Sequence, residues 1–487
     1  MSRVGIVLAL AFAGLAGWAG YWQVFRSAEL SSAPDNPAVV AAARNAVRGR
    51  ILDREGRVLA TNRRDANGEP YRVYVGPAIA PVVGYSSRLF GEAGLEQRYD
   101  AQLVGLVRGD PVAELLRKFD PDQYDPQDLH LSLSLELQRL AVRELGEDEG
   151  AVVMLDPRTG EVLVLASTPT FDADLIAQPD AAASQQAFAA LSDDPRDPLV
   201  PRATLGQYVP GSVFKIVTGL AALGSGAVTR DTTFRQQPQA EIDGLLVTGF
   251  RVRDGHHLFT GGERLDLMEA TEVSCNIWYA LAGLETGGDA LVEYASQLGF
   301  GEPIAFDLPT STSQVTGGGG PLGGGFLDEV ELANASYGQA ETLASPLQMA
   351  LVASTVANDG VLMRPRLVTA FESEDGGLRT VEPAEIRRVV PVEAARTMRE
   401  AMTAAVEGEL GQLFTPGARV PGILTAGKSG TAELGGAGEP NSWFIGFAPA
   451  DDPQIAIAVL VARGGRGGER AAPLAGRMLQ AYFELSR

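Results

Sequence analysis

The spacing of apolar residues predicts strands and helices along much of the chain. Residues 129–145, LHLSLSLELQRLAVREL, start with strict alternation and continue with amphipathic spacing, which predicts a strand and then a helix. Apolar runs flank the turns DPRTG, within residues 151–166, and PADDP, within residues 441–462, and predict two hairpins. Residues 474–485, LAGRMLQAYFEL, are typical of a helix. Because strands stand at both ends of a helix-rich segment, we expect an α+β fold, one antiparallel sheet flanked by helices, over residues 145–487.

The N-terminus carries a long uncharged run. Residues 4–22, VGIVLALAFAGLAGWAGYW, come close to the roughly 20 apolar residues that cross a bilayer as a helix. Arg3 precedes the run, and Trp18, Tyr21 and Trp22 cluster at its far end. This pattern predicts one transmembrane helix over residues 4–25, with a cytoplasmic N-terminus and an exported remainder. The alternative is a cleaved signal peptide, although the run is long for one and offers a poor cleavage site.

A second unit is expected between this run and residue 140. Residues 48–62, RGRILDREGRVLATN, alternate around Arg54-Glu55-Gly56 and predict a small hairpin. Residues 63–130 are rich in Gly, Pro and charge, which indicates an irregular α/β module. We therefore expect a separate N-terminal domain over residues 26–140, which agrees with a length of 487 residues that exceeds one ordinary domain.

Charge and rare residues exclude several function classes. The net charge of -21 disfavours a nucleic-acid partner, because like charge repels the phosphate backbone. The single cysteine, Cys275, cannot form an internal disulfide. With only His130, His256 and His257, the chain offers few ligands for a histidine-rich metal site, and we expect no metal and no cofactor.

Residues 422–431, GILTAGKSGT, fit two incompatible functions. Read as G-x-x-x-x-G-K-S, they match a phosphate-binding loop, which needs a strand before it and a helix after it. The preceding residues contain no convincing strand, and the Gly and Pro that follow oppose a helix. We therefore expect an edge strand that presents Lys428 and the hydroxyls of Ser429 and Thr431.

A nucleophile and a base are candidates in YVPGSVFKIVTGLAAL, residues 208–223. Ser212 and Lys215 are three residues apart on one face of a nearly all-apolar helix. Free backbone N–H groups at the helix start can stabilise an oxyanion near Ser212. A desolvated lysine loses its proton more readily and can activate the hydroxyl. The alternative is a lysine whose stem packs while its amine reaches water.

The segment VSCNIW, residues 273–278, supplies Ser274 and Asn276. Together with Ser212-x-x-Lys215 and Lys428-Ser-Gly, it completes the three-part signature S-x-x-K, S-D-N and K-T-G of penicillin-binding proteins and serine β-lactamases, with Cys275 in place of the Asp and Ser429 in place of the Thr. The chain resembles class B penicillin-binding proteins, which are membrane-anchored D,D-transpeptidases that cross-link peptidoglycan. The segments GAVVMLDPRTGEVLVLASTPTFD, SYGQAETLASPLQMA and WFIGFAP resemble their transpeptidase domain, and RGRILDREGRVLA resembles their N-terminal pedestal, a dimerisation-type domain.

The resemblance implies a role for each residue of the signature. Ser212 would attack the penultimate D-Ala carbonyl of the donor stem peptide, and Lys215 would take its proton. Ser274 would relay a proton to the leaving D-alanine, and Asn276 would hold Lys215 and the substrate amide. Lys428 would add positive charge that helps to keep Lys215 neutral.

Three further residues would bind the substrate. Ser429, Gly430 and Thr431 form this group, with the two hydroxyls on the terminal carboxylate. The backbone N–H groups of Ser212 and Thr431 would form the oxyanion hole. The resemblance also implies inhibition by β-lactams, location in the bacterial cell membrane, and partnership with a multi-spanning peptidoglycan glycosyltransferase and with division or elongation proteins.

Other functions fit the sequence less well. A secreted β-lactamase would share the signature, but no E-x-x-L-N stretch lies between Asn276 and Lys428, and the N-terminal module would be superfluous. A β-lactam sensor would need further membrane helices. A wall-binding scaffold with an inactive site would not need Ser212, Lys215 and Lys428.

Overall fold

The computed structural model describes residues 18, 47–105, 125–254, 264–434 and 438–486. The predicted transmembrane helix, residues 4–25, lies outside these ranges apart from Trp18. Within the described ranges, no helix is both long and apolar enough to cross a membrane.

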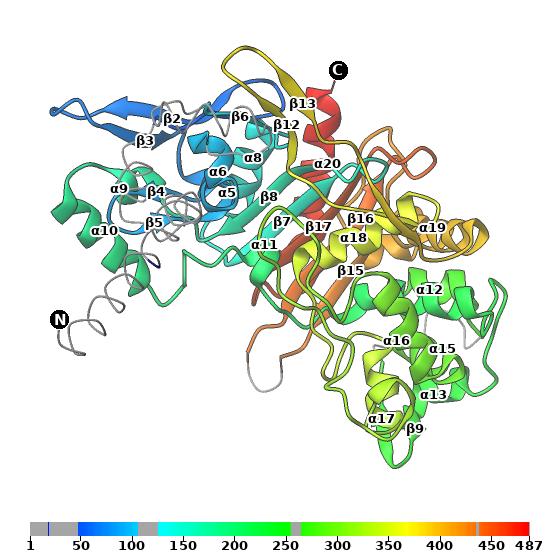
Figure 1. Cartoon of the computed structure of the whole chain (residues 1–487). Coiled ribbons are helices and arrows are strands. Elements are labelled where there is room, and N and C mark those ends of the chain that lie inside the picture. The colour runs from blue at the N-terminus through cyan, green and yellow to red at the C-terminus, as the bar shows by residue number, and fades with distance from the viewer. Residues whose placement is uncertain (1–17, 19–46, 106–124, 255–263, 435–437, 487) are drawn as a thin grey trace, which may run out of the picture.

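The centre of the molecule is a five-stranded antiparallel sheet (Figure 1). Its strand order is β15-β16-β17-β7-β8, which joins the first predicted hairpin to the last and confirms both. The turn between β7 and β8 closes because Asp156 accepts a hydrogen bond from the backbone N–H of Arg158, at 2.8 Å, and Gly160 adopts a φ of 73°. The strands are β7 (Gly150–Leu155), β8 (Val162–Thr168), β15 (Ala426–Ala432), β16 (Asn441–Ala448) and β17 (Ile455–Val461).

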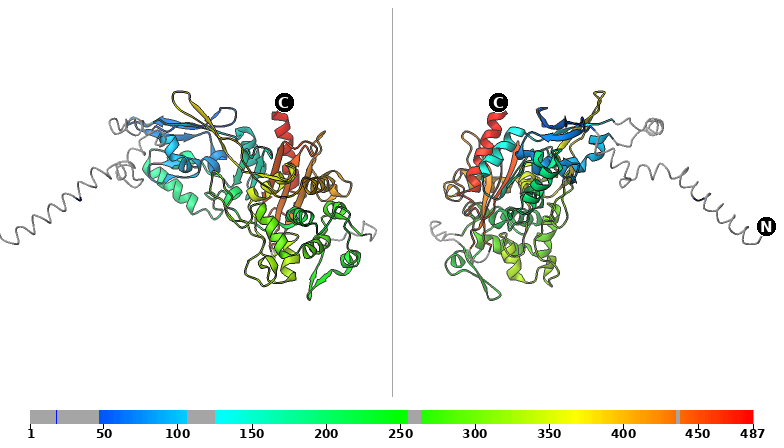
Figure 2. Two further views of the ribbon diagram at one scale, coloured as in Figure 1. Left: turned by 45° about the vertical axis from the view of Figure 1, so that its right-hand side comes forward. Right: turned by 90° about the vertical axis from the view of Figure 1, so that its left-hand side faces the viewer.

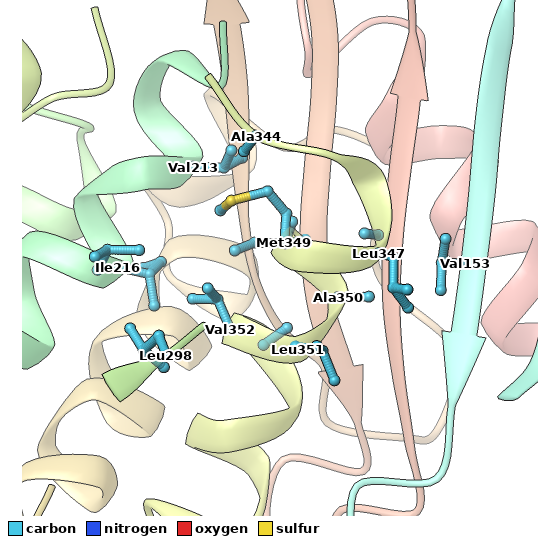
Figure 3. Close-up of a cluster of buried hydrophobic side chains, with 14 of the residues drawn as sticks. Val153, Val213, Ile216, Leu298, Ala344, Leu347, Met349, Ala350, Leu351 and Val352 are labelled. Atoms are coloured by element: carbon cyan, nitrogen blue, oxygen red, sulfur yellow. The ribbon is translucent and has the colours of Figure 1, made fainter. Parts of the chain in front are cut away.

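Helices cover both faces of this sheet, so β16, β17, β7 and β8 are buried along their whole length. Two helices, α8 (Leu135–Leu145) and α20 (Ala471–Leu485), pack on one face and confirm the helices predicted there. On the other face lie α18 (Pro346–Ala357), α19 (Val392–Glu407) and α11 (Arg202–Leu205). Figure 3 shows how α18 fills the core: Leu347 points toward Val153 of the sheet, and Met349 points toward Val213.

A helical region stands beside the edge strand β15. Its first segments, η2 (Gly211–Phe214) and α12 (Lys215–Ser225), pack on β15 and on α15 and α16, so the sheet edge and the helices meet where the signature residues lie. The remaining elements are α13 (Gln237–Asp243), β9 (Leu245–Val247), β10 (Phe250–Val252), α14 (Leu267–Glu272), α15 (Asn276–Thr286), α16 (Gly288–Gln297), η4 (Gly323–Gly325), α17 (Glu329–Ala335) and η5 (Gly411–Leu413).

The N-terminal part forms a second, six-stranded sheet at the opposite end of the molecule (Figure 2). The predicted hairpin at residues 48–62 is confirmed as β1 and β2. Two strands of this sheet, β12 and β13, come from residues 368–380, which the sequence pattern placed in the C-terminal domain. The order is β13 (Leu378–Thr380), β12 (Val368–Glu372), β6 (Asp128–Leu131), β1 (Ile51–Leu52), β2 (Val58–Arg64) and β3 (Pro70–Tyr74).

Short elements complete the chain, and those between residues 77 and 104 agree with the irregular module expected at residues 63–130. They are η1 (Pro77–Ile79), α4 (Ala80–Val83), β4 (Ser86–Ser87), β5 (Gly91–Glu92), α5 (Gly94–Arg98), α6 (Asp100–Val104), α9 (Ala173–Ala177), α10 (Ala181–Ser192), β11 (Val361–Met363) and β14 (Glu385–Arg388).

Candidate active site

Ser212 lies at the point where η2 approaches the edge strand. Gly211 before it has a φ of 57° and donates its N–H to the carbonyl of Gly338 at 2.8 Å. A Cβ at position 211 would lie 2.9 Å from the carbonyl oxygen of Thr431, so only glycine lets this segment approach β15. Ser212 is partly exposed and lines a cavity of about 620 Å³. The candidate nucleophile is therefore accessible, at the beginning of a buried helical segment.

Lys215 is fully buried, as expected for a base that has lost its hydration. Its Nζ donates to the backbone carbonyl of Ser274 at 2.5 Å and to Ser274 Oγ at 3.1 Å. Burial lowers the pKa of Lys215 to about 8, although the Asp254 carboxylate acts in the opposite direction. Among the described residues, Lys215 makes no hydrogen bond to Ser212 Oγ or to Asn276. The alternative in which this amine reaches water is wrong, because the side chain has no exposed surface.

Ser274 stands between the two buried lysines of the site. It follows α14 with a φ of 61°, a left-handed conformation that is costly for serine, and the Cys275 N–H closes the turn on the Ala270 carbonyl at 2.8 Å. Its Oγ accepts hydrogen bonds from both Lys215 and Lys428, the latter at 2.8 Å. Because the two amines occupy both lone pairs, the hydroxyl proton of Ser274 remains available to a third group.

Lys428 lies in the middle of β15 and is 1% exposed. Its Nζ donates to Ser274 Oγ at 2.8 Å and to the carbonyl of Ser429 at 2.9 Å. Burial, and then the charge of Lys215, hold the pKa of Lys428 well below its usual range. The resemblance implies a charged Lys428 that helps to keep Lys215 neutral. Two amines that share one hydroxyl in a buried site cannot both be protonated without strong repulsion, so a charge on either lysine favours the neutral form of the other.

The three proposed substrate-binding residues differ in their surroundings. The Ser429 hydroxyl donates to the carbonyl of Phe414 at 2.8 Å, so its proton is already used. Thr431 is exposed in the cavity, and its Oγ1 accepts the N–H of Gly467 at 3.1 Å, which leaves its proton free to donate. Gly430 packs against the nucleophile segment, because a Cβ there would lie 3.0 Å from the carbonyl of Pro210. Thr431 is thus better placed than Ser429 to bind a carboxylate.

Asn276 begins α15 and lines the same cavity as Ser212 and Thr431. Its backbone N–H, with that of Ile277, donates to the carboxylate of Asp254, which follows the β9–β10 hairpin. Asp254 was not predicted as a site residue. The sequence RVRDG around it has no motif, and only the fold brings it to the start of α15.

Asp254, Glu241 and Cys275 each place one potential ligand atom within 4.8 Å of the others. The Cys275 thiol donates to Glu241 Oε1 at 2.8 Å, and its sulfur accepts the N–H of Trp278 at 3.2 Å. Burial raises the pKa of this thiol, and Asp254 already caps α15. The protein's own hydrogen bonds therefore account for this cluster, in which the buried Cys275 caps the start of α15.

The structure decides between the two interpretations of residues 422–431. Lys428 lies within an edge strand and pairs opposite Ile445, β15 continues to Ala432, and the next element among the described residues is the strand β16. A phosphate-binding loop would place this lysine at the start of a helix. The prediction of an edge strand is confirmed.

Comparison with known families agrees with this geometry. Residues 150–480 match the penicillin binding protein transpeptidase domain, and residues 48–119 match the penicillin binding protein A dimerisation domain. Peptidoglycan D,D-transpeptidase PbpA of Mycolicibacterium smegmatis is 34% identical over 97% of this chain and 96% of its own length. The protein of that name in Mycobacterium tuberculosis is 32% identical over 95% of this chain and 94% of its own.

Solved structures show the same fold with a drug on the enzyme. The ceftriaxone acyl-enzyme complex of penicillin-binding protein A from M. tuberculosis aligns with a TM-score of 0.79 and 30% identity over 90% of this chain and 99% of that one. Its penicillin G acyl-enzyme complex aligns with a TM-score of 0.77 and 30% identity over 91% and 99%. The chain belongs to the penicillin-binding protein transpeptidase family.

Proposed function

We propose that this chain is a peptidoglycan D,D-transpeptidase that cross-links stem peptides through an acyl-enzyme on Ser212 and is inhibited by β-lactams. The observation that carries the proposal is the pair of buried lysines, Lys215 and Lys428, whose amines share the hydroxyl of Ser274 beside Ser212. A site with one accessible hydroxyl, a desolvated amine and a second hydroxyl can form and break an ester without a metal ion or cofactor.

In the first step, Ser212 Oγ attacks the penultimate D-Ala carbonyl of the donor as Lys215 takes its proton. The backbone N–H groups of Ser212 and Thr431 stabilise the oxyanion. When the C–N bond breaks, Ser274 passes a proton from the lysine pair to the leaving D-alanine amine. Thr431 binds the terminal carboxylate. Ser429 and Gly430 keep this part of β15 in place through the hydrogen bond to Phe414 and the contact with Pro210.

In the second step, the amine of an acceptor peptide attacks the ester carbonyl. It loses a proton to the lysine pair, the new amide C–N bond forms as the ester C–O bond to Ser212 breaks, and Ser212 Oγ recovers its proton. Asn276 holds the substrate amide from the opposite wall of the cavity. The acceptor replaces an activated water because it is held close to the ester.

Labelling by a fluorescent penicillin tests this function. The full chain should be labelled, and Ser212→Ala should not. Ser192→Ala, at the exposed end of α10, is the matched control and should be labelled like the unmodified chain. Labelling that persists in Ser212→Ala would refute the proposed nucleophile.

We also propose the arrangement in the cell envelope: an anchor at residues 4–25, a pedestal domain at residues 26–140 and the transpeptidase domain at residues 145–487. The match of residues 48–119 to a dimerisation domain supports the pedestal. A multi-spanning peptidoglycan glycosyltransferase and division or elongation proteins are the proposed partners. Deletion of residues 4–25 should move the chain from the membrane fraction to the soluble fraction, and a deleted chain that stays with the membrane would contradict the anchor.

A further inference from the structure

The cavity beside Ser212 contains charges that the mechanism above does not use. It extends from the nucleophile to the β9–β10 hairpin and to the residue after β15, and four charged side chains line it: Arg251, Arg253, Asp254 and Glu433. Two of them already form hydrogen bonds with other groups of the protein. Arg251 donates to the carbonyl of Asp243 at 2.6 Å, and Asp254 accepts the N–H of Ile277 at 3.2 Å.

The other two, Arg253 and Glu433, have no such role. Both are exposed, and neither forms a hydrogen bond or an ion pair with any residue in the described part of the chain. They approach the cavity from different elements, Arg253 after β10 and Glu433 after β15. Glu433 lines the cavity together with Tyr337, and burial, followed by the carboxylates of Asp254 and Glu433, raises the pKa of the Tyr337 hydroxyl. The cavity thus carries one unpaired cation and one unpaired anion.

The direction of the substrate follows from the proposed function, on which this inference rests. The donor carbonyl lies at Ser212, and its terminal carboxylate lies at Thr431. The part of the donor that stays on the enzyme must then extend into the remainder of the cavity, toward Arg253 and Glu433. A volume of about 620 Å³ is in the range that holds a small-molecule ligand.

We propose that Arg253 and Glu433 determine donor specificity by binding a zwitterionic side chain on the residue before D-Ala-D-Ala. Arg253 binds its carboxylate, and Glu433 binds its ammonium group. A diamino dicarboxylic acid has this chemistry, whereas lysine offers the ammonium group alone. A donor with only one charge satisfies one residue and meets the like charge of the other.

Three penicillins with the same phenyl group test each charge separately, because their side chain stands for this part of the donor. Benzylpenicillin is neutral at the side-chain α-carbon, carbenicillin has a carboxylate there, and ampicillin has an ammonium group. Arg253→Gln should lower the acylation rate constant of carbenicillin relative to benzylpenicillin by about two- to fivefold. Glu433→Gln should lower that of ampicillin by a similar factor and raise that of carbenicillin. Arg235→Gln, an exposed arginine outside the cavity, should change neither ratio.

Peptide donors then test the combination. Acylation by a donor with diaminopimelate before D-Ala-D-Ala should be faster than by the lysine analogue, and Arg253→Gln should bring the two rates together. Unchanged carbenicillin and diaminopimelate preferences in Arg253→Gln would overturn the proposal, as would an effect confined to the acceptor step. Benzylpenicillin labelling of Ser212 reports separately on the proposed function, since it should remain intact in all three variants.

Discussion

At the scale of single residues, the use of lysine distinguishes the site from the rest of the chain. The sequence contains only three lysines, at positions 118, 215 and 428, and its other strong cations are arginines. Arginine stays protonated in proteins, whereas a buried lysine can lose its proton. Both lysines in the described part of the chain are buried at the site, where a neutral amine is needed.

Lys215→Ala and Lys215→Arg should therefore both lose at least about 100-fold in acylation rate, because neither provides a base. The second-order rate constant with a fluorescent penicillin measures this loss, and thermal melting establishes that each variant is folded. A folded Lys215→Arg that acylates at a normal rate would show that the charge of Lys215, and not its basicity, is needed.

The acylation rate should also rise with pH. Burial lowers the pKa of Lys215 to about 8, so the neutral amine becomes the major form above that pH. The rate should increase about tenfold per unit below this pKa and level off above it. Asp254→Asn should move the midpoint to lower pH, because the Asp254 carboxylate favours the protonated amine. A flat profile between pH 6 and 9 would exclude Lys215 as the titrating base.

At the scale of elements, activity depends on the contact between the edge strand and the nucleophile segment. A Cβ at Gly430 would lie 3.0 Å from the carbonyl of Pro210 and 3.1 Å from the backbone nitrogen of Val213, so η2 would have to move away from β15. Gly430→Ala should reduce acylation by about 10-fold or more, because a small displacement of a nucleophile is costly. Gly438→Ala, where no atom lies within 4 Å of the added Cβ, is the matched control. Equal rates in the two variants would contradict the importance of this contact.

At the scale of the whole molecule, a substitution beside the N-terminal sheet should change the stability of the fold and leave acylation of Ser212 unchanged. Glu96 is fully buried between Arg48 and Arg72, with contacts of 2.9 and 2.6 Å. Burial alone would raise the pKa of Glu96, but the two guanidinium groups outweigh it and the pKa is lowered. The resulting stabilisation is present at neutral pH and is lost as the pH falls below the usual range of glutamate.

Glu96→Gln should lower the free energy of unfolding by about 3 kcal/mol at neutral pH, because it leaves the buried guanidinium group of Arg72 without its counter-charge and Arg48 with Asp100 as its remaining partner. Ser212 should still be acylated at the normal rate below the melting transition. Exposed Glu69→Gln should melt like the unmodified chain. Loss of acylation in folded Glu96→Gln would show that the N-terminal sheet contributes directly to the active site.

Local patterns predicted most of the catalytic sheet, the helix that carries Lys215, and the edge strand with Lys428, because alternation and helical spacing are short-range signals. They missed the pairing of β12 with β6, since strand partners far apart in sequence leave no local trace. They also missed Asp254 and the bond from Ser429 to Phe414. These contacts depend on loops with no periodicity, and only the folded chain brings them together.

The fate of the acyl-enzyme tests the central claim most directly. The exported domain should be acylated with benzylpenicillin, freed of excess drug, and followed by mass spectrometry of the peptide that contains Ser212. A transpeptidase has no second base to activate water, so the penicilloyl ester should persist for many minutes and block labelling by a second drug. Loss of the ester within seconds, with steady turnover of penicillin, would identify a β-lactamase and contradict the account.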